Sequence, residues 1–128
     1  VGLINWTPEG FIGQMFATMK PYAPPPPPGA QPGPLWGVPE HVTALLGDQV
    51  TGLRAERHVL MVDRFATAAD FLDFFKAYYG PTIAIYRSIA EDLAMVARLD
   101  GELLALAERF GAGRTFEWEY LLVTATRA

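Results

Sequence analysis

The spacing of hydrophobic residues changes along the chain, and each spacing predicts a different element. Val1–Ile4 is a continuous apolar run, typical of a short, fully buried strand. From Pro8 to Lys20 the apolar residues recur at helical spacing, with Thr7 as the expected N-cap and Pro8 at the first helical position. The chain is therefore expected to open with a strand and a helix that ends before Pro21.

Proline dominates the next segment, residues 21–37. Proline fixes φ and has no backbone N–H, so this stretch is expected to form an extended polyproline linker or lid. A proline run can also bind an aromatic groove in a partner, but the basic residue at fixed offset is missing, so a stiff spacer is the simpler interpretation. A short helix is expected from Val38 to Leu46, with Pro39 in its first turn and Gly47 at its end.

Two strands are predicted in the second half of the chain. From Leu53 to Val62, chargeable and apolar residues alternate, which is typical of a half-exposed strand. From Phe116 to Thr126 the chain is extended again, and Tyr120–Val123 is apolar on both faces. The last strand is therefore expected inside a sheet, with neighbours on both sides.

Three helices are expected between these strands. Thr67 is the predicted cap of the first, which carries an aromatic stripe and ends at Gly80-Pro81. The stripe consists of Phe71, Phe74, Phe75 and Tyr78. The second helix is predicted to turn Ile85, Ile89, Leu93 and Val96 inward. Asp100 is the expected cap of the third, which ends at Gly111.

Composition narrows the class of protein. The chain has 128 residues, of which 51% are hydrophobic and 19% charged, with a net charge of −4, so a folded domain without a nucleic-acid surface is expected. It has no run near the roughly 20 apolar residues that span a bilayer, and its start does not resemble a secretory signal, so a cytoplasmic location is expected. Without cysteine, disulfides and thiolate chemistry are excluded.

The opening residues resemble a known family. Gly2–Gly13, with the sequence GLINWTPEGFIG, resembles the fifth sheet strand and following helix of bacterial class I S-adenosylmethionine-dependent methyltransferases, of the kind grouped with quinone-biosynthesis methylases. Phe116–Thr126 resembles the strand that closes their sheet. The resemblance implies an α/β fold, the C-terminal part of a Rossmann-like sheet with a helical cap. A chain that folds by itself would instead be α+β.

The resemblance also implies that the residues that hold the cofactor lie in a different half of the enzyme. In such enzymes an N-terminal half carries the glycine-rich turn and the acidic residue that hold the cofactor, and neither is found here. The chain is thus expected to be a partial domain, with parts at 1–20, 21–37 and 38–128. It is expected to be inactive alone, to need the N-terminal half or a second copy as partner, and to work with S-adenosylmethionine only in the full-length enzyme.

Seven residues are candidates for contact with a small, largely apolar methyl acceptor. Asn5 and Trp6 follow the carboxyl end of the first strand, where ligands bind in open α/β sheets. The others are aromatic residues that could line a pocket: Phe11, Trp36, Tyr78, Tyr79 and Tyr86. Core packing is the alternative for Phe11, and packing at a helix end is the alternative for the three tyrosines. The pattern assigns no catalytic base and no metal ligand, since His41 and His58 lie on separate elements.

A second class of function fits the same pattern. A non-enzymatic α+β module could use its aromatic helices to enclose an apolar ligand or a partner helix. Binding of S-adenosylmethionine by the longer protein separates the two interpretations.

Overall fold

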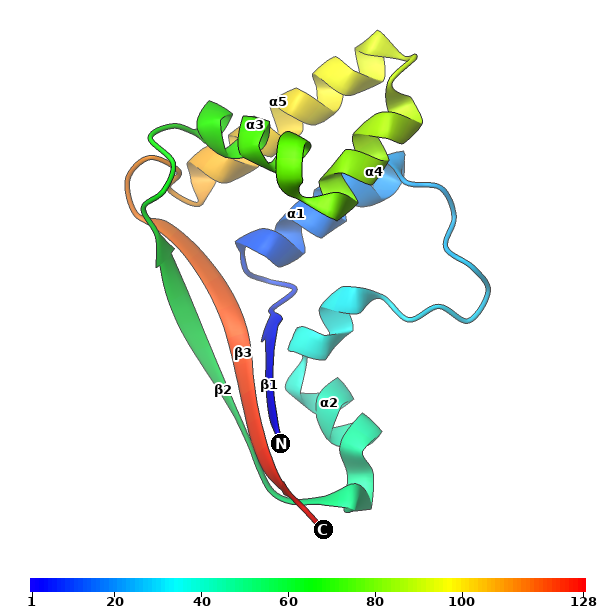
Figure 1. Ribbon diagram of the computed structural model, residues 1–128, viewed down its shortest axis with the longest axis vertical. Coiled ribbons are helices and arrows are strands. Elements are labelled where there is room, and N and C mark those ends of the chain that lie inside the picture. Colours follow the sequence, from blue (N-terminus) through cyan, green and yellow to red (C-terminus); the bar gives the residue numbers. More distant parts are fainter.

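The computed structural model describes all residues from Val1 to Ala128 and has an α+β fold with three strands and five α-helices (Figure 1). The elements follow in the order β1 (Gly2–Trp6), α1 (Phe11–Met19), η1 (Lys20–Tyr22), η2 (Gly33–Gly37), α2 (Pro39–Leu46), η3 (Gly47–Gln49), β2 (Val50–Val62), α3 (Ala68–Tyr78), α4 (Gly80–Ile89), α5 (Leu93–Arg109) and β3 (Phe116–Arg127), where η marks a 3-10 turn. None of the helices has the length and apolar content needed to cross a membrane.

The sheet has the strand order β1-β3-β2, and β3 is antiparallel to both neighbours. β1 and β2 therefore run in the same direction on either side of β3. The prediction that Tyr120–Val123 lies inside a sheet is confirmed, with Leu121 and Val123 each 1% exposed. The prediction of a fully buried first strand is wrong for this chain. Ile4 is 68% exposed, because it packs into neither hydrophobic core.

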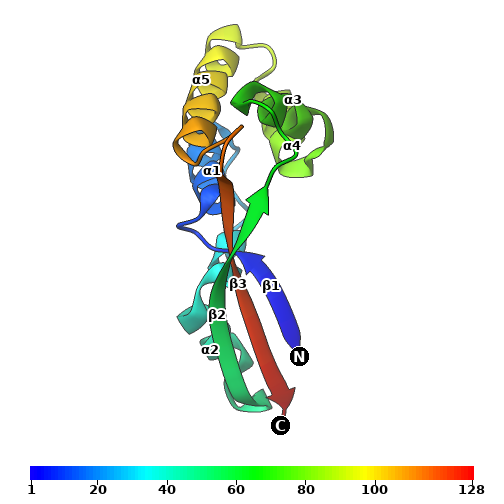
Figure 2. The ribbon, with the colours of Figure 1, turned by 90° about the vertical axis from the view of Figure 1, so that its left-hand side faces the viewer.

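Two hydrophobic cores lie on opposite faces of the sheet. Residues directly opposite in an antiparallel pair share a face, so Trp118 lies on the same face as its partner Leu60. On that face, one half of the sheet packs against the cluster of α1, α3, α4 and α5. Leu121 and Val123 point to the other face and pack on Val42 of α2. The molecule is consequently long and narrow, with helices at one end and α2 beside the other end (Figure 2).

Several predicted elements are confirmed. The extended segment predicted for residues 21–37 is confirmed for residues 23–32 only, because the 3-10 turns η1 and η2 occupy its two ends. α2 covers nearly the predicted range before Gly47, whose φ is +52°. Thr67 caps α3, since its Oγ1 accepts the Asp70 N–H at 3.1 Å. Gly111 follows the end of α5 with φ +88°, a conformation that favours glycine.

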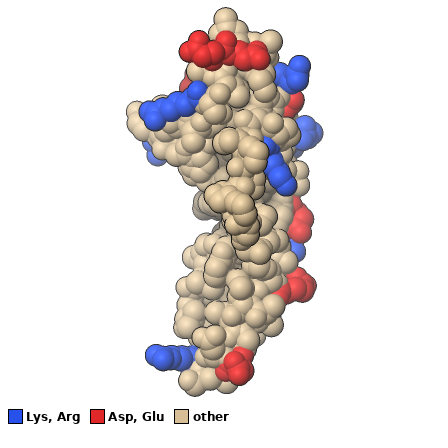
Figure 3. Space-filling view, turned by 90° about the vertical axis from the view of Figure 1, so that its right-hand side faces the viewer, with Lys and Arg blue, Asp and Glu red and all other residues tan.

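Figure 3 shows a narrow waist with few charged side chains between the ends of the molecule.

The start of α1 differs from the prediction. The helix begins at Phe11 instead of Pro8, and Thr7 does not cap it. The Thr7 hydroxyl instead accepts the Gly10 N–H at 3.1 Å, which closes a turn between β1 and α1. Thr7 is held in this role by Glu119 of β3, a contact that its local sequence does not predict.

The boundary between the last two helices was also predicted wrongly. α4 ends at Ile89, and α5 is a single helix from Leu93, capped by Asp92, whose side chain accepts the Met95 N–H at 3.1 Å. Leu93 is 78% exposed instead of inward. Asp100 lies inside α5 and forms an ion pair with Lys76 at 2.6 Å. Asp100 therefore pairs with Lys76 of α3 and is not the helix cap that the sequence spacing predicts.

The aromatic stripe of α3 is only partly buried. Phe71 is 0% exposed and Phe75 is 6% exposed, whereas Tyr78 is 74% exposed at the end of the helix. β2 starts at Val50, three residues before the predicted Leu53, and continues through an irregularity between Thr51 and Arg54. The earlier start of β2 follows from its pairing with β3, in which Val50 lies opposite Arg127 and Thr51 opposite Thr126.

Candidate functional site

A cavity of about 290 Å³ lies at the carboxyl end of β1. We call it the β1 pocket. It is formed where β1, α1, the η2 turn and the α3–α4 junction meet, and its lining residues are Asn5, Trp6, Gly13, Phe16, Gly33, Pro34 and Tyr79. The structure therefore brings together three of the seven predicted site residues, namely Asn5, Trp6 and Tyr79.

Two glycines allow the backbone to close around this pocket. A Cβ at Gly37 would lie 2.0 Å from the Trp6 carbonyl oxygen, and one at Gly13 would lie 2.2 Å from the Thr7 carbonyl oxygen. Both distances are far below van der Waals contact, so any side chain there would push the elements apart. The close approach of η2 and α1 to the end of β1 fixes the walls of the pocket.

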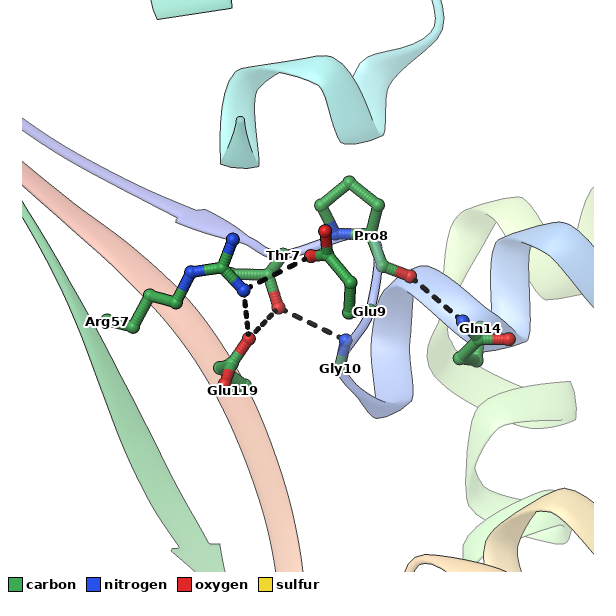
Figure 4. A network of polar contacts seen from close by, with 7 residues as sticks. All are labelled: Thr7, Pro8, Glu9, Gly10, Gln14, Arg57 and Glu119. Atoms are coloured by element: carbon green, nitrogen blue, oxygen red, sulfur yellow. Dashed lines mark hydrogen bonds and ion pairs between the residues drawn. The ribbon is translucent and has the colours of Figure 1, made fainter. Parts of the chain in front are cut away.

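A polar network holds the turn between β1 and α1 (Figure 4). Thr7 Oγ1 donates to Glu119 Oε1 at 2.7 Å, and the same carboxylate oxygen lies 3.2 Å from Arg57 Nη1. Arg57 Nη1 also lies 3.5 Å from Glu9 Oε2. The network joins β2, β3 and the turn. Its ion pairs are half-exposed, so each contributes about 0–1 kcal/mol, and its main effect is to position the turn. Local sequence patterns gave no signal for this network, because its members are far apart in the chain.

A second cavity, of about 380 Å³, lies at the carboxyl end of β2. We call it the α3 cavity. Eight of its nine lining residues are hydrophobic, and the full lining is Leu60, Val62, Arg64, Phe65, Phe74, Phe75, Tyr78, Tyr79 and Trp118. Tyr79 borders both cavities, because it lies at the break between α3 and α4. Tyr78, also a predicted site residue, lies at the α3 cavity instead of the β1 pocket.

The other three predicted site residues line neither cavity. Phe11 is fully buried, and its ring contacts those of Phe71, Phe110, Phe116 and Trp118. Trp36 is 39% exposed, and its ring centroid lies 6.4 Å from that of His41. The Tyr86 hydroxyl donates to Asp100 Oδ1 at 2.6 Å, within the helical cluster. Packing accounts for the position of Phe11 and Tyr86.

Burial keeps two tyrosines, Tyr79 and Tyr86, protonated at neutral pH. Burial raises the pKa of Tyr79 above its ordinary value of 10.0. Burial, followed by the hydrogen bond to Asp100, raises the pKa of Tyr86 still further. A protonated phenol can donate a hydrogen bond but does not act as a base. Tyr79, which lines the β1 pocket, is therefore a candidate hydrogen-bond donor to a ligand there.

The β1–α1 turn leaves no room for a nucleotide phosphate. The β1–α1 turn contains Gly10 and Gly13, as a nucleotide-binding turn could, but the space above both is filled by the chain itself. A Cβ at Gly10 would lie 2.9 Å from Glu119 Cβ and 2.9 Å from Thr7 Oγ1. These glycines serve packing and leave no cradle for a phosphate or ribose. No group of three or more His, Asp or Glu residues is arranged to hold a metal ion.

Comparisons with known proteins give relatives in mycobacteria. "Uncharacterized protein Rv1405c" of Mycobacterium tuberculosis is 46% identical over 127 residues, which are 99% of this chain and 46% of the relative. "Uncharacterized protein Rv1403c" of the same species is 41% identical over an equal span, with the same shares of each chain. No family model matches the chain, and no solved structure matches it. The chain is thus similar to mycobacterial proteins, and it spans about half the length of the curated relatives it matches.

Proposed function

We propose that the chain is the substrate-side part of an S-adenosylmethionine-dependent methyltransferase that acts on a small, largely apolar acceptor. The strand arrangement is the observation that carries this proposal. In the class that the sequence resembles, the sheet ends with two strands that pair antiparallel after the fifth strand. Here β2 and β3 pair antiparallel, and β1, which corresponds to the fifth strand, has a free edge.

The open surfaces of β1 support contact with a further segment of a longer protein. Ile4 is 68% exposed and lies opposite Leu122, so an apolar strip of that face is uncovered beside the free edge. A parallel strand along β1 would satisfy its unpaired backbone groups, and a helix over that face would bury Ile4. The relatives are about twice as long as this chain, so they contain residues for both elements.

The β1 pocket supports a small, largely apolar acceptor. Trp6, Phe16 and Tyr79 provide aromatic walls, while Asn5 adds an amide that can hydrogen-bond to the acceptor. Methyl transfer requires little more from this side than orientation and exclusion of water. When it is bound by the remainder of the protein, S-adenosylmethionine supplies the electrophilic methyl group. Asn5 and Tyr79 orient the acceptor, and the aromatic walls exclude water.

Calorimetric titration with S-adenosylmethionine tests the proposal. The chain alone is expected to give no binding heat, whereas the full-length 46% identical relative is expected to bind. Failure of the full-length relative to bind the cofactor contradicts the proposal. A low-micromolar dissociation constant for the isolated chain, about −8 kcal/mol, contradicts the assignment of the cofactor site to the remainder of the protein.

A pair of variants tests the role of the β1 edge. The chain is mixed with the part of the mycobacterial relative that lies outside the matched residues, and assembly is followed by light scattering after size exclusion. Ile4→Glu is expected to abolish assembly, because it places a charge on the strip that the other segment covers. The matched control is Leu45→Glu on α2, which changes a side chain that is 47% exposed and distant from that edge. Equal assembly of both variants contradicts the proposed contact.

The α3 cavity favours the second candidate, a non-enzymatic module that binds an apolar ligand. Eight hydrophobic residues around about 380 Å³ suit such a ligand. This candidate is preferred if the full-length relative ignores S-adenosylmethionine while the chain binds an apolar ligand.

A further inference from the structure

Residues 56–64, which we call the β2 edge, run along and just past an open edge of the sheet. One side of the β2 backbone pairs with β3, and no strand lies along the other side (Figure 2). Val59, Leu60 and Met61 lie there in succession, and they are 49%, 47% and 52% exposed. Since successive residues of a strand point to opposite faces, neither face of the sheet is fully covered at this point. An open, apolar edge of this kind can pair with another strand.

The β2 edge lacks the features that commonly keep an edge strand unpaired. Those features include a charged side chain, a proline or a bulge in the exposed part of the strand. Residues 59–62 are Val-Leu-Met-Val, and β2 pairs with β3 without interruption from Arg54 to Val62. The further strand proposed above adds to β1, on the other side of β3, so it leaves the β2 edge open. Another strand can therefore lie along the β2 edge in the longer protein as well as in this chain.

The charges on either side of Leu60 are self-complementary. Glu56 and Arg57 precede the apolar residues, Asp63 and Arg64 follow them, and all four are exposed. In an antiparallel pair of identical strands with Leu60 opposite Leu60, Glu56 lies opposite Arg64 of the second copy. Arg57 lies opposite Asp63 in the same register. Opposite charges directly across a strand pair are stabilising and like charges are destabilising, so this order of charges favours a second copy of the chain as the partner.

We propose that the β2 edge joins two copies of this chain as an antiparallel, two-fold symmetric pair with Leu60 at the centre. Val59 of each copy then lies opposite Met61 of the other, so the central pairs are all apolar. Leu60 lies opposite Trp118 on the face that carries the helical cluster, and it lines the α3 cavity. Leu60 of the second copy therefore lies beside that cavity, and the half-exposed apolar residues at the centre lose contact with water. The interface needs neither the β1 pocket nor a cofactor.

Single cysteines test the register of the pair. The chain has no cysteine, so each variant carries one thiol. Oxidation of Leu60→Cys is expected to give a disulfide-linked dimer, because directly opposite residues lie within the Cα separation that a disulfide spans, roughly 4.4–6.8 Å. Glu56→Cys is the matched control on the same strand. Its two thiols lie roughly 25 Å apart in this register, since a strand rises about 3.4 Å per residue. No cross-link for Leu60→Cys, or equal cross-linking of both variants, overturns the proposal.

An exchange of charges tests why the partner is a second copy. Dimerisation is measured by sedimentation equilibrium in the chain that carries Ile4→Glu, so that association through the open side of β1 does not contribute. Glu56→Arg and Arg64→Glu are each expected to weaken the dimer at least fivefold at low salt, because each places like charges opposite one another. The two changes together restore opposite charges, and they should return the dissociation constant to within twofold of the value for Ile4→Glu alone. Weakening without this restoration overturns the proposed register.

A matched control separates the β2 edge from other apolar surfaces. Leu60→Lys is expected to weaken the same dimer at least tenfold, because it places two like charges at the two-fold axis. Leu45→Glu on α2 changes a side chain of equal exposure and is expected to leave the dissociation constant within twofold. Equal effects of the two variants, or a monomeric Ile4→Glu chain at submillimolar concentration, overturn the proposal. Circular dichroism is expected to show that each variant is folded, since every altered side chain is exposed. No cofactor enters these experiments, so their outcome does not depend on the test of methyltransferase function.

Discussion

Replacement of Phe71 by alanine is expected to cause a large loss of stability, because this ring lies at the centre of the main core. Phe71 is 0% exposed, and its ring centroid lies 4.4 Å from that of Phe75, 5.1 Å from Phe11 and 5.6 Å from Phe116. Removal of a buried phenylalanine side chain from its environment costs about 1.5–3 kcal/mol. The cavity that remains and the lost ring contacts raise the expected loss to about 3–5 kcal/mol.

Phe74→Ala is the matched control, one turn along the same helix. Phe74 is half-buried and contacts Phe65, Tyr78 and the Arg64 guanidinium. Its loss is expected to cost about 1–2 kcal/mol, since part of the ring is already in water. Urea unfolding followed by tryptophan fluorescence and circular dichroism gives both values, provided that the slope of free energy against denaturant is unchanged. A cost below about 1 kcal/mol for Phe71→Ala, or equal costs for the two variants, would refute this account of the core.

Three further predictions follow from other parts of the structure. Gly13→Ala should lower the free energy of unfolding in urea by at least about 2 kcal/mol, because the added Cβ would lie 2.2 Å from a backbone atom. Gly101→Ala should raise it by about 0.5–1 kcal/mol, because Gly101 lies in α5 with open space around it. Similar values for both variants would be inconsistent with the close approach at Gly13. The folded-state pKa of Tyr86 lies above its ordinary 10.0, so the folded state holds this proton more tightly than the unfolded state, and stability should fall as pH rises above 10. Tyr86→Phe should reduce this fall in stability with pH, and an unchanged pH dependence would contradict the raised pKa of Tyr86. The chain should run as a dimer or larger assembly in light scattering at micromolar concentration, because the edge of β1 is open; a monomer with cooperative unfolding would show that the edge needs no partner.

Local sequence determined the elements whose limits depend on one or two neighbouring residues. Thr67 marks the start of α3 because its hydroxyl reaches an amide three residues on, and Gly47 and Gly111 mark helix ends because they adopt positive φ. The sequence also placed Asn5 and Trp6 beside a cavity at the carboxyl end of the first strand, although both are the last residues of β1 and do not follow it as predicted. These inferences need only short-range geometry.

Tertiary structure decided between local signals of equal strength. Asp92 and Asp100 both precede helical runs of apolar residues, and either can cap a helix. Asp92 caps α5, while Lys76 and Tyr86 bind Asp100 inside that helix. Both partners lie outside α5, so no window of sequence around Asp100 contains the information.

The candidate functional surfaces also depend on contacts that the local sequence does not contain. An apolar run predicts a strand, but whether Ile4 is buried depends on what packs over its face of the sheet, and neither hydrophobic core includes it. Trp118 looks like any core aromatic in the sequence. It borders the α3 cavity only because β2, β3 and α3 meet around that cavity. The sequence by itself determined where strands and helices form, through contacts within a few residues, and tertiary packing decided which of their side chains remain open to a ligand or a partner.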